Sequence, residues 1–177
     1  MDEIEAGYAA LIRTIDEVRD EKGKYAGELA GQEGALLSRM AGMAAPLVGQ
    51  IGMNLLKKGR QDQNGEIFNA EYYRERMIVL GKTEPMPYRP DDPTKKVDDQ
   101  FCALNEKGEF VELMYSSDGQ TVDSYTCPLG PEDAFGIYGY EVMLMLYRAL
   151  REYLKGEEGI VAALGTTVEF LRNEKKD

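Results

Sequence analysis

Residues 97–127 read VDDQFCALNEKGEFVELMYSSDGQTVDSYTC, and this stretch alternates apolar and polar residues as antiparallel strands do. Two tetrapeptides divide it into three runs, NEKG at 105–108 and SSDG at 116–119. Each ends in the glycine that a tight turn with a bulge requires. The stretch therefore predicts a three-stranded antiparallel meander.

The first turn also sets a register, because its flanking residues must pair. The predicted pairs are Asn105 opposite Glu109, Ala103 opposite Val111, and Phe101 opposite Leu113. In this register the apolar side chains fall on one face of the sheet, which favours it over a shifted one.

The segment before the meander is rich in proline. Residues 83–96 read TEPMPYRPDDPTKK, with four prolines between Pro85 and Pro93. Proline fixes φ and donates no hydrogen bond, so we expect an extended loop, whose order the sequence does not determine. Residues 70–82 just upstream predict a short helix that gives way to a strand.

Helical periodicity dominates the first third of the chain. Apolar residues recur every three or four positions over residues 2–21, which predicts an amphipathic helix: Ile4, Tyr8, Leu11, Ile15 and Val18. Gly23 predicts the C-terminal end of this helix, and a second helix is expected from about residue 28 to residue 58.

The second helix contains SRMAGMAAPLVGQIGMNLLKKG at residues 38–59. This stretch could span a membrane, lie at a membrane surface or pack inside the protein. Packing is favoured, since the stretch is short, glycine-rich and not bordered by a basic face. Small residues lie on one side, which admits another backbone from this chain or a partner chain: Ser38, Gly42, Ala45 and Gly49. Met40 and Met43 are candidates to line a cavity beside a kink at Pro46.

After the meander, Pro131 and the acidic residues behind it predict a helix that restarts after Gly139 and runs to about Leu154. A final helix is expected over residues 160–171. The predicted fold is therefore α+β, a small antiparallel three- to four-stranded sheet packed with four to five helices. We expect a single domain over 1–177, with a helical part at 1–58 and the sheet and C-terminal helices at 70–177.

The chain carries 32 acidic and 21 basic residues and no histidine. Its acidity disfavours nucleic acid and anionic membranes as partners, and the absence of histidine excludes catalytic sites built on that residue. No carboxylate cluster has the spacing of a metal site, and no cofactor motif is found. No export leader is recognisable, and the expected location is the cytoplasm.

Two cysteines are the remaining reactive groups. Strands one and three of a meander lie too far apart for a disulfide, so Cys102 and Cys127 are predicted to be free thiols. Cys127 precedes a proline and a helix start, where a thiolate is stabilised, although a structural cysteine is the more ordinary interpretation. Tyr73 and Arg74 are candidates to bind a planar acid or phosphate, with surface packing as the alternative.

Tyr25, Gly27 and Gly31 form a Y-x-G-x-x-x-G pattern, and residues 126–129 read Thr-Cys-Pro-Leu after the sheet. In these motifs and in element order over roughly residues 25–155, the chain resembles L-2-amino-thiazoline-4-carboxylate hydrolase-like proteins and vinyl-reductase-like small-molecule-binding domains. The resemblance implies a small-molecule pocket near Cys127 and the glycine-bearing helix.

Two functions follow as hypotheses. The first is a small-molecule-binding or accessory domain without catalysis, which acts as an oligomer or as a subunit of a larger complex. Its candidate ligand-binding residues are Met40, Met43, Tyr73, Arg74 and Cys127. The second is a hydrolase-like small-molecule enzyme in which Cys127 is the nucleophile or Glu141 the acid–base group.

Overall fold

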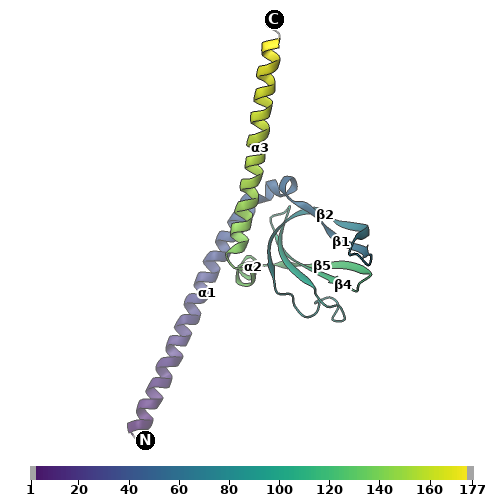
Figure 1. The fold of residues 1–177 in the computed structure, drawn as a ribbon. Helices are drawn as coiled ribbons and strands as arrows, with labels where there is room; N and C mark the ends of the chain where they lie inside the picture. The colour runs from purple at the N-terminus through teal and green to yellow at the C-terminus, as the bar shows by residue number, and fades with distance from the viewer. Residues whose placement is uncertain (1–2, 175–177) are drawn as a thin grey trace.

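The structure, a computed structural model, describes residues 3–174. Two long helices form an extended rod, and a barrel is attached to its side near the middle (Figure 1). The two ends of the chain lie at opposite ends of this rod (Figure 1). The elements are α1 (Glu3–Ile51), β1 (Met53–Gln61), β2 (Ile67–Thr83), β3 (Asp99–Asn105), β4 (Phe110–Ser117), β5 (Thr121–Leu129), α2 (Pro131–Tyr138) and α3 (Glu141–Glu174).

The predicted fold class is wrong. The described residues form three helices and one closed five-stranded antiparallel barrel, where an open sheet of three to four strands with four to five helices was expected. β1 begins at Met53, inside the range predicted for the second helix, and β2 replaces the short helix predicted within 70–82. β1 then pairs with β5 through Lys58–Asp123, and this contact closes the barrel.

Fewer helices are present because the predicted interruptions do not occur. α1 continues through Gly23, and α3 continues through Gly156 and Gly159, so each pair of expected helices is one helix. A single glycine costs a helix only about 1 kcal/mol, which is too little to stop propagation when flanking residues favour the helix. Residue 2 of the predicted first helix lies outside the described residues.

The meander and its register are confirmed. β3 and β4 pair Ala103 with Val111 and Phe101 with Leu113, and the amide of Asn105 donates to the carbonyl of Glu109 at 3.0 Å. Both turn glycines have positive φ, 77° at residue 108 and 85° at residue 119, a region that side chains disfavour.

The main core lies between the helices and the outer wall of the barrel. One side of α1 is buried at four positions spaced by four, three and four residues: Leu37, Ala41, Ala44 and Val48. Val142 and Leu146 of α3 and the strand residues Leu80 and Leu104 complete this core. A second, smaller cluster occupies the opposite face of the strands and includes Met77, Ala103 and Leu113.

Residues 38–51 are helical and pack against the barrel, as the favoured interpretation required, but the helix ends at Ile51. A Cβ atom on Gly52 would lie 2.7 Å from the carbonyl oxygen of Val48 and 3.0 Å from the backbone of Met77. Only glycine permits this tight passage from α1 into β1. Within residues 3–174, no helix combines the length and apolarity that crossing a bilayer requires.

Candidate functional site

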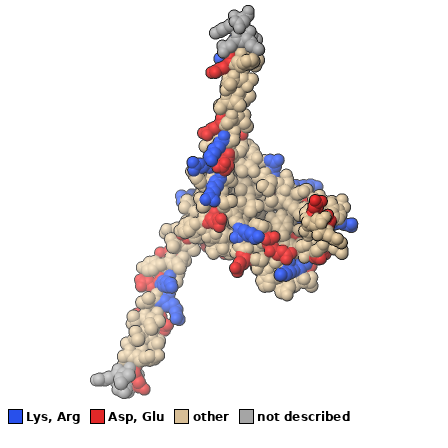
Figure 2. Space-filling model, viewed as in Figure 1, with Lys and Arg blue, Asp and Glu red and all other residues tan. Residues whose placement is uncertain are grey.

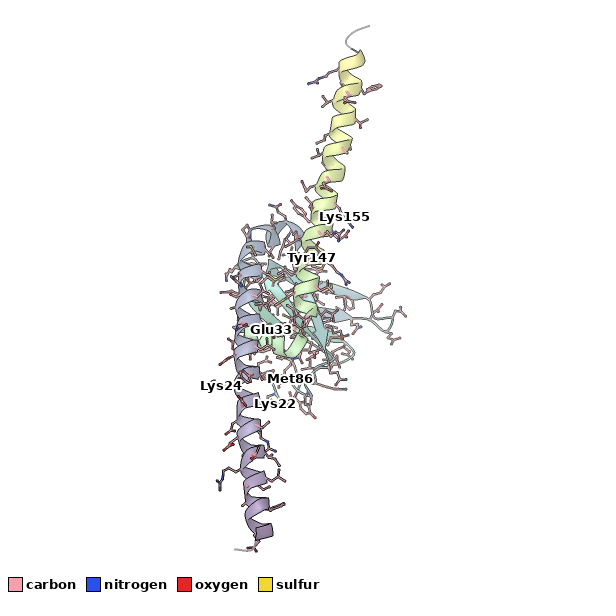
Figure 3. All side chains as sticks on the ribbon, turned by 90° about the vertical axis from the view of Figure 1, so that its left-hand side faces the viewer. Lys22, Lys24, Glu33, Met86, Tyr147 and Lys155 are labelled. Carbon is pink, nitrogen blue, oxygen red and sulfur yellow. The ribbon has the colours of Figure 1, made fainter. Side chains whose placement is uncertain are left out.

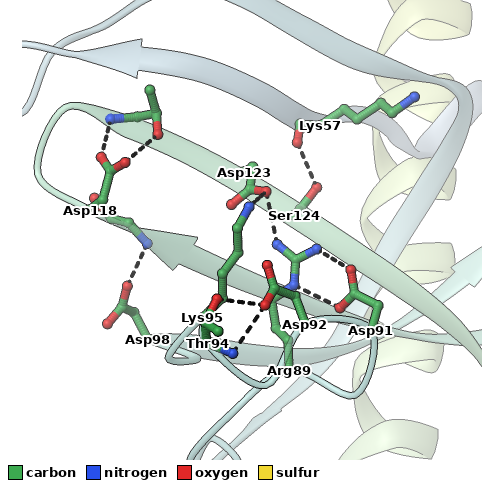
Figure 4. A network of polar contacts seen from close by, with 12 residues as sticks. Lys57, Arg89, Asp91, Asp92, Thr94, Lys95, Asp98, Asp118, Asp123 and Ser124 are labelled. Carbon is green, nitrogen blue, oxygen red and sulfur yellow. Dashed lines mark hydrogen bonds and ion pairs between the residues drawn. The ribbon is translucent and has the colours of Figure 1, made fainter.

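The proline-rich loop at residues 84–98 is folded onto the barrel by a cluster of charges (Figure 4). Arg89 is 6% exposed and donates from Nε and Nη2 to the two carboxylate oxygens of Asp91, at 2.9 and 2.5 Å. Its Nη1 lies 2.9 Å from Oδ2 of Asp123 on β5, and Lys95 pairs with the same oxygen. One carboxylate of the barrel thus anchors two cations of the loop.

Charge pairing explains why an arginine is tolerated in this buried position. The hydrogen bonds that Arg89 donates to Asp91 raise the pKa of Arg89, and they lower the pKa of Asp91 in turn. The guanidinium also lies over the ring of Tyr125, 5.6 Å from its centroid. Such an arrangement fixes a loop but offers no free acid or base.

A hollow of about 240 Å³ opens beside this cluster. It is lined by Thr94, Lys95, Lys96, Ser116, Ser117, Asp118, Thr121 and Asp123. The hydroxyl oxygen of Ser116 is buried and makes no hydrogen bond. The hollow therefore presents hydroxyl and ammonium donors, together with carboxylates, to a small polar molecule.

A second polar junction ties the sheet to α2. Glu112 is 7% exposed, and its Oε1 accepts hydrogen bonds from Nε2 of Gln100 at 2.5 Å and from the hydroxyl of Tyr138 at 3.1 Å. The thiol of Cys127 lies 3.8 Å from Oε2. Gln100 also accepts from the amide of Met86, so one carboxylate links β3, β4, β5, α2 and the proline-rich loop.

The two thiols are free, as predicted, and neither is activated. In the strand register, Cys102 on β3 and Cys127 on β5 both lie opposite Glu112 of β4, one on each side. Burial raises the pKa of Cys102 to about 12, and burial followed by the charge of Glu112 raises the pKa of Cys127. A raised pKa disfavours the thiolate that a nucleophile needs at neutral pH.

The candidate ligand-binding residues do not form one site. Tyr73 and Arg74 border a hollow of about 530 Å³ on β2, and the hydroxyl of Tyr73 lies 2.9 Å from that of Ser124. Met40 packs against the main core, whereas Met43 is 73% exposed. Cys127 faces Glu112, apart from these residues.

Glu141, the candidate acid–base residue, is exposed at the first position of α3. No contact among the described residues joins it to Cys127.

The small residues of α1 face their own chain in part. A Cβ atom on Gly34 would lie 2.5 Å from Cγ of Glu132, so α2 makes the closest approach there. Ala45 meets Gly108 of the β3–β4 turn, and Ser38 lines a hollow of about 420 Å³ with residues of that turn. Gly42 and Gly49 are exposed. The contact role of these small residues toward another chain stays a prediction.

Apart from Cys127, the residues that form the two polar clusters are not among the candidate site residues of the sequence. The register of the meander already placed Glu112 opposite Cys102, on a face that also carries Leu104 and Phe110, so a buried carboxylate could have been inferred. Arg89 offered a weaker signal, an arginine two positions before Asp91 in a proline-rich loop. Among residues 3–174, no three His, Cys, Asp or Glu side chains are grouped to hold a metal ion.

Comparisons with protein-family models, with curated proteins and with solved structures find no match for this chain, so its family resemblance stays a prediction.

Proposed function

We propose that this chain is an accessory protein without catalysis of its own, which works as an oligomer and carries a barrel as its ligand-binding part. The helices would join the subunits, and the barrel would be held to the side of the resulting rod.

The observation that carries this proposal is the exposed apolar surface of the two long helices. Residues 3–30 of α1, here called the N-terminal arm, and residues 154–174 of α3, the C-terminal arm, project away from the barrel in opposite directions (Figures 1 and 3). Large apolar side chains along both arms are about half exposed or more, among them Leu11, Tyr25, Val161 and Leu164. In Figure 2, uncharged surface covers most of the C-terminal arm.

Arms with such exposed apolar surface are unfavourable in an isolated subunit. Helical stability in proteins comes mostly from burying an apolar face, and along both arms the large apolar side chains are exposed to water. Completing the burial of a half-exposed Leu, Ile or Val side chain stabilises by about 1 kcal/mol. Many such side chains on one molecule therefore favour association.

The hollow beside Lys95 supports the ligand-binding part of the proposal, because it gathers hydroxyl, ammonium and carboxylate groups, and one of them, the buried Ser116 hydroxyl, makes no hydrogen bond. Free thiols with raised pKa values suit a protein of a reducing compartment, and we propose the cytoplasm. The hydrolase-like alternative has no comparable support, since neither Cys127 nor Glu141 has an activating partner in the described contacts.

Sedimentation equilibrium or size exclusion with light scattering tests the oligomer. We expect a mass of at least twice that of the chain at micromolar concentration. Leu11→Glu and Leu164→Glu should each shift the mass toward the monomer, because they place a charge within the apolar surface. Ala9→Glu and Ala163→Glu, on other sides of the same helices, are the matched controls. A monomeric parent protein at tens of micromolar would refute the proposal.

A further inference from the structure

The apolar residues of the N-terminal arm follow the spacing of a coiled coil. Six of them, 46% to 67% exposed, are separated by gaps of three and four residues or by a full heptad, and we call them the N-terminal seam: Tyr8, Leu11, Ile15, Val18, Tyr25 and Leu29. Between Val18 and Tyr25, the heptad position that would continue the seam is occupied by a charged residue, Lys22, and this is the single interruption within the range. A repeat of 3.5 residues is the pattern of helices that wind around one another.

The C-terminal arm repeats this pattern. Its seam consists of five residues, 45% to 68% exposed: Leu154, Val161, Leu164, Val168 and Leu171. It is interrupted once as well, by Glu157, between Leu154 and Val161. Each seam therefore carries one charged residue, and the two charges are opposite.

The two seams match in one orientation. When the helices run antiparallel with Lys22 opposite Glu157, every seam residue meets a seam position of the other helix. The facing pairs are Tyr8–Leu171, Leu11–Val168, Ile15–Leu164, Val18–Val161, Tyr25–Leu154 and Leu29–Leu150. Leu150 is half-buried and continues the C-terminal seam toward the barrel.

Other pairings leave the charges uncompensated. Two N-terminal arms in parallel would place Lys22 against Lys22, and two C-terminal arms would place Glu157 against Glu157. If an N-terminal arm paired in parallel with a C-terminal arm, each layer of the core would bring together the same heptad position of both helices. Lys22 and Glu157 occupy different heptad positions, so each would then face an apolar residue and remain unpaired in the core.

The shape of the subunit fits the antiparallel match. The arms point to opposite ends of one rod, and α1 and α3 run in the same direction along it (Figure 1). A two-fold axis perpendicular to the rod therefore places each N-terminal arm against the C-terminal arm of the other copy, antiparallel. In this register, Glu174 at the end of α3 lies level with residue 5, two residues from the start of α1.

Contacts within the chain lead to the same arrangement. The subunit's own α3 and Tyr140, the residue before it, accompany α1 from Glu33 to Gln50 through hydrogen bonds from Tyr140 and Tyr153. From Leu29 back to Gly7, the residues of α1 are exposed. The α3 of a second copy would cover α1 from Leu29 toward the N-terminus, the part of α1 that the α3 of the same subunit does not reach.

We propose that two copies of this chain form a closed antiparallel dimer, in which each N-terminal seam packs against the partner's C-terminal seam with Lys22 paired to Glu157. The inference rests on the proposed oligomeric function and specifies its partner and register. The seams of both copies would bury on the order of 1,500–2,000 Å², from roughly 80 Å² for each half-exposed side chain, which is the range of specific interfaces.

Charge exchange tests the pairing in the full-length chain. Lys22→Glu and Glu157→Lys should each weaken the dimer by about tenfold or more, because each like-charged contact occurs twice in the dimer. The double variant Lys22→Glu/Glu157→Lys should restore the dissociation constant to within about twofold. The matched controls are Lys24→Glu (Figure 3) and Glu158→Lys, which change exposed charges outside the seams. Circular dichroism and the melting temperature verify that each variant is folded.

A cross-link tests the register independently. In a Cys127→Ser background, Ile15→Cys combined with Leu164→Cys should give a dimer linked between these two positions on mild oxidation. Ile15→Cys alone should give no such dimer. The two positions belong to the two arms, which project in opposite directions (Figure 1), so a link within a subunit is excluded.

The outcomes separate the two proposals. A cross-link between residues 15 and 164 with charge rescue supports the antiparallel dimer. This register is overturned if residue 15 cross-links to residue 15 of another copy, or if the double variant does not restore the dissociation constant. The oligomeric function would still stand in either case. A monomer overturns both.

Discussion

The hydroxyl of Tyr138 on α2 donates a 3.1 Å hydrogen bond to Glu112 on β4, and this contact joins the helical rod to the barrel wall. Both residues are at least nine-tenths buried, and Gln100 shares the same carboxylate oxygen. Burial, with Glu112 as the next cause, raises the pKa of Tyr138. The junction is thus stable only while the phenol remains protonated and the acceptor is present.

Removal of the acceptor should destabilise the fold. We expect Glu112→Ala to lower the free energy of unfolding by about 2–3 kcal/mol, because it leaves Gln100 and Tyr138 buried without an acceptor. Urea denaturation followed by circular dichroism measures this change. Glu71→Ala, an exposed acid on β2, is the matched control and should change stability by less than about 0.5 kcal/mol. Equal effects of the two substitutions would contradict the role of Glu112.

Stability should fall at alkaline pH through Cys102. Its pKa in the folded state is about 12, against an ordinary value of 9.0, so the folded state retains a proton that the unfolded state loses. The stabilisation is therefore complete below pH 9 and is lost as pH rises from 9 toward 12, by up to about 4 kcal/mol. Cys102→Ala should unfold more easily at neutral pH but show a shallower loss between pH 9 and 11. A slope identical to that of the parent protein would exclude Cys102 as the cause.

Alkylation should be slow at Cys127. Burial and the charge of Glu112 raise its pKa, so the reactive thiolate is scarce at neutral pH. We expect Cys127 to react with iodoacetamide at pH 7.5 several-fold more slowly than the same residue in urea-unfolded protein. The site is identified by mass spectrometry of the labelled peptides. Fast and selective labelling of Cys127 in the folded protein would instead favour the hydrolase-like alternative.

The proline-rich loop should depend on Arg89. Arg89→Ala leaves Asp91 and Asp123 without their guanidinium and should cost about 3 kcal/mol of stability, as the loss of one partner of a buried ion pair does. Limited proteolysis should then cleave within residues 84–98. Lys82→Ala breaks a solvent-exposed pair with Asp99 and should cost less than about 1 kcal/mol. An uncleaved loop in the Arg89 variant would show that the prolines alone order it.

The same pair predicts an acid response. Arg89 lowers the pKa of Asp91 in the folded state, so its contribution to stability is present above the ordinary value of 3.8 and is lost as pH falls below it. Arg89→Ala should therefore show a weaker loss of stability between pH 4 and pH 2 than the parent protein. Thermal melts across this range provide the measurement.

Some of the fold could be predicted because its determinants are local. The turns at 105–108 and 116–119 and the alternation around them fixed the meander and placed Phe101 opposite Leu113. The seam of α1 is visible in the sequence from Tyr8 to Val18, but Gly23 predicts a helix end before the apolar residues Tyr25 and Leu29 that continue the pattern. Glycine weakens a helix by too little to decide its end.

The remaining strands could not be predicted because their partners are distant. β1 reads MNLLKKGRQ, and its register with β2 contains several irregularities, so no clean alternation appears in the sequence. Its pairing with Asp123 on β5 closes the barrel across more than sixty residues. The candidate sites depend on the same closure, because Arg89 can contact Asp123 only when β5 lies beneath the proline-rich loop.

The sequence by itself determined the meander, its register, the free thiols and the amphipathic arms, because each depends on spacing within a few residues or within one turn. Only the tertiary structure decided that the sheet closes, that Glu112 and Arg89 are buried with their partners, and which helix faces remain bare. Those outcomes depend on contacts between segments far apart in the chain, where the gain from burial in the assembled core outweighs local preference.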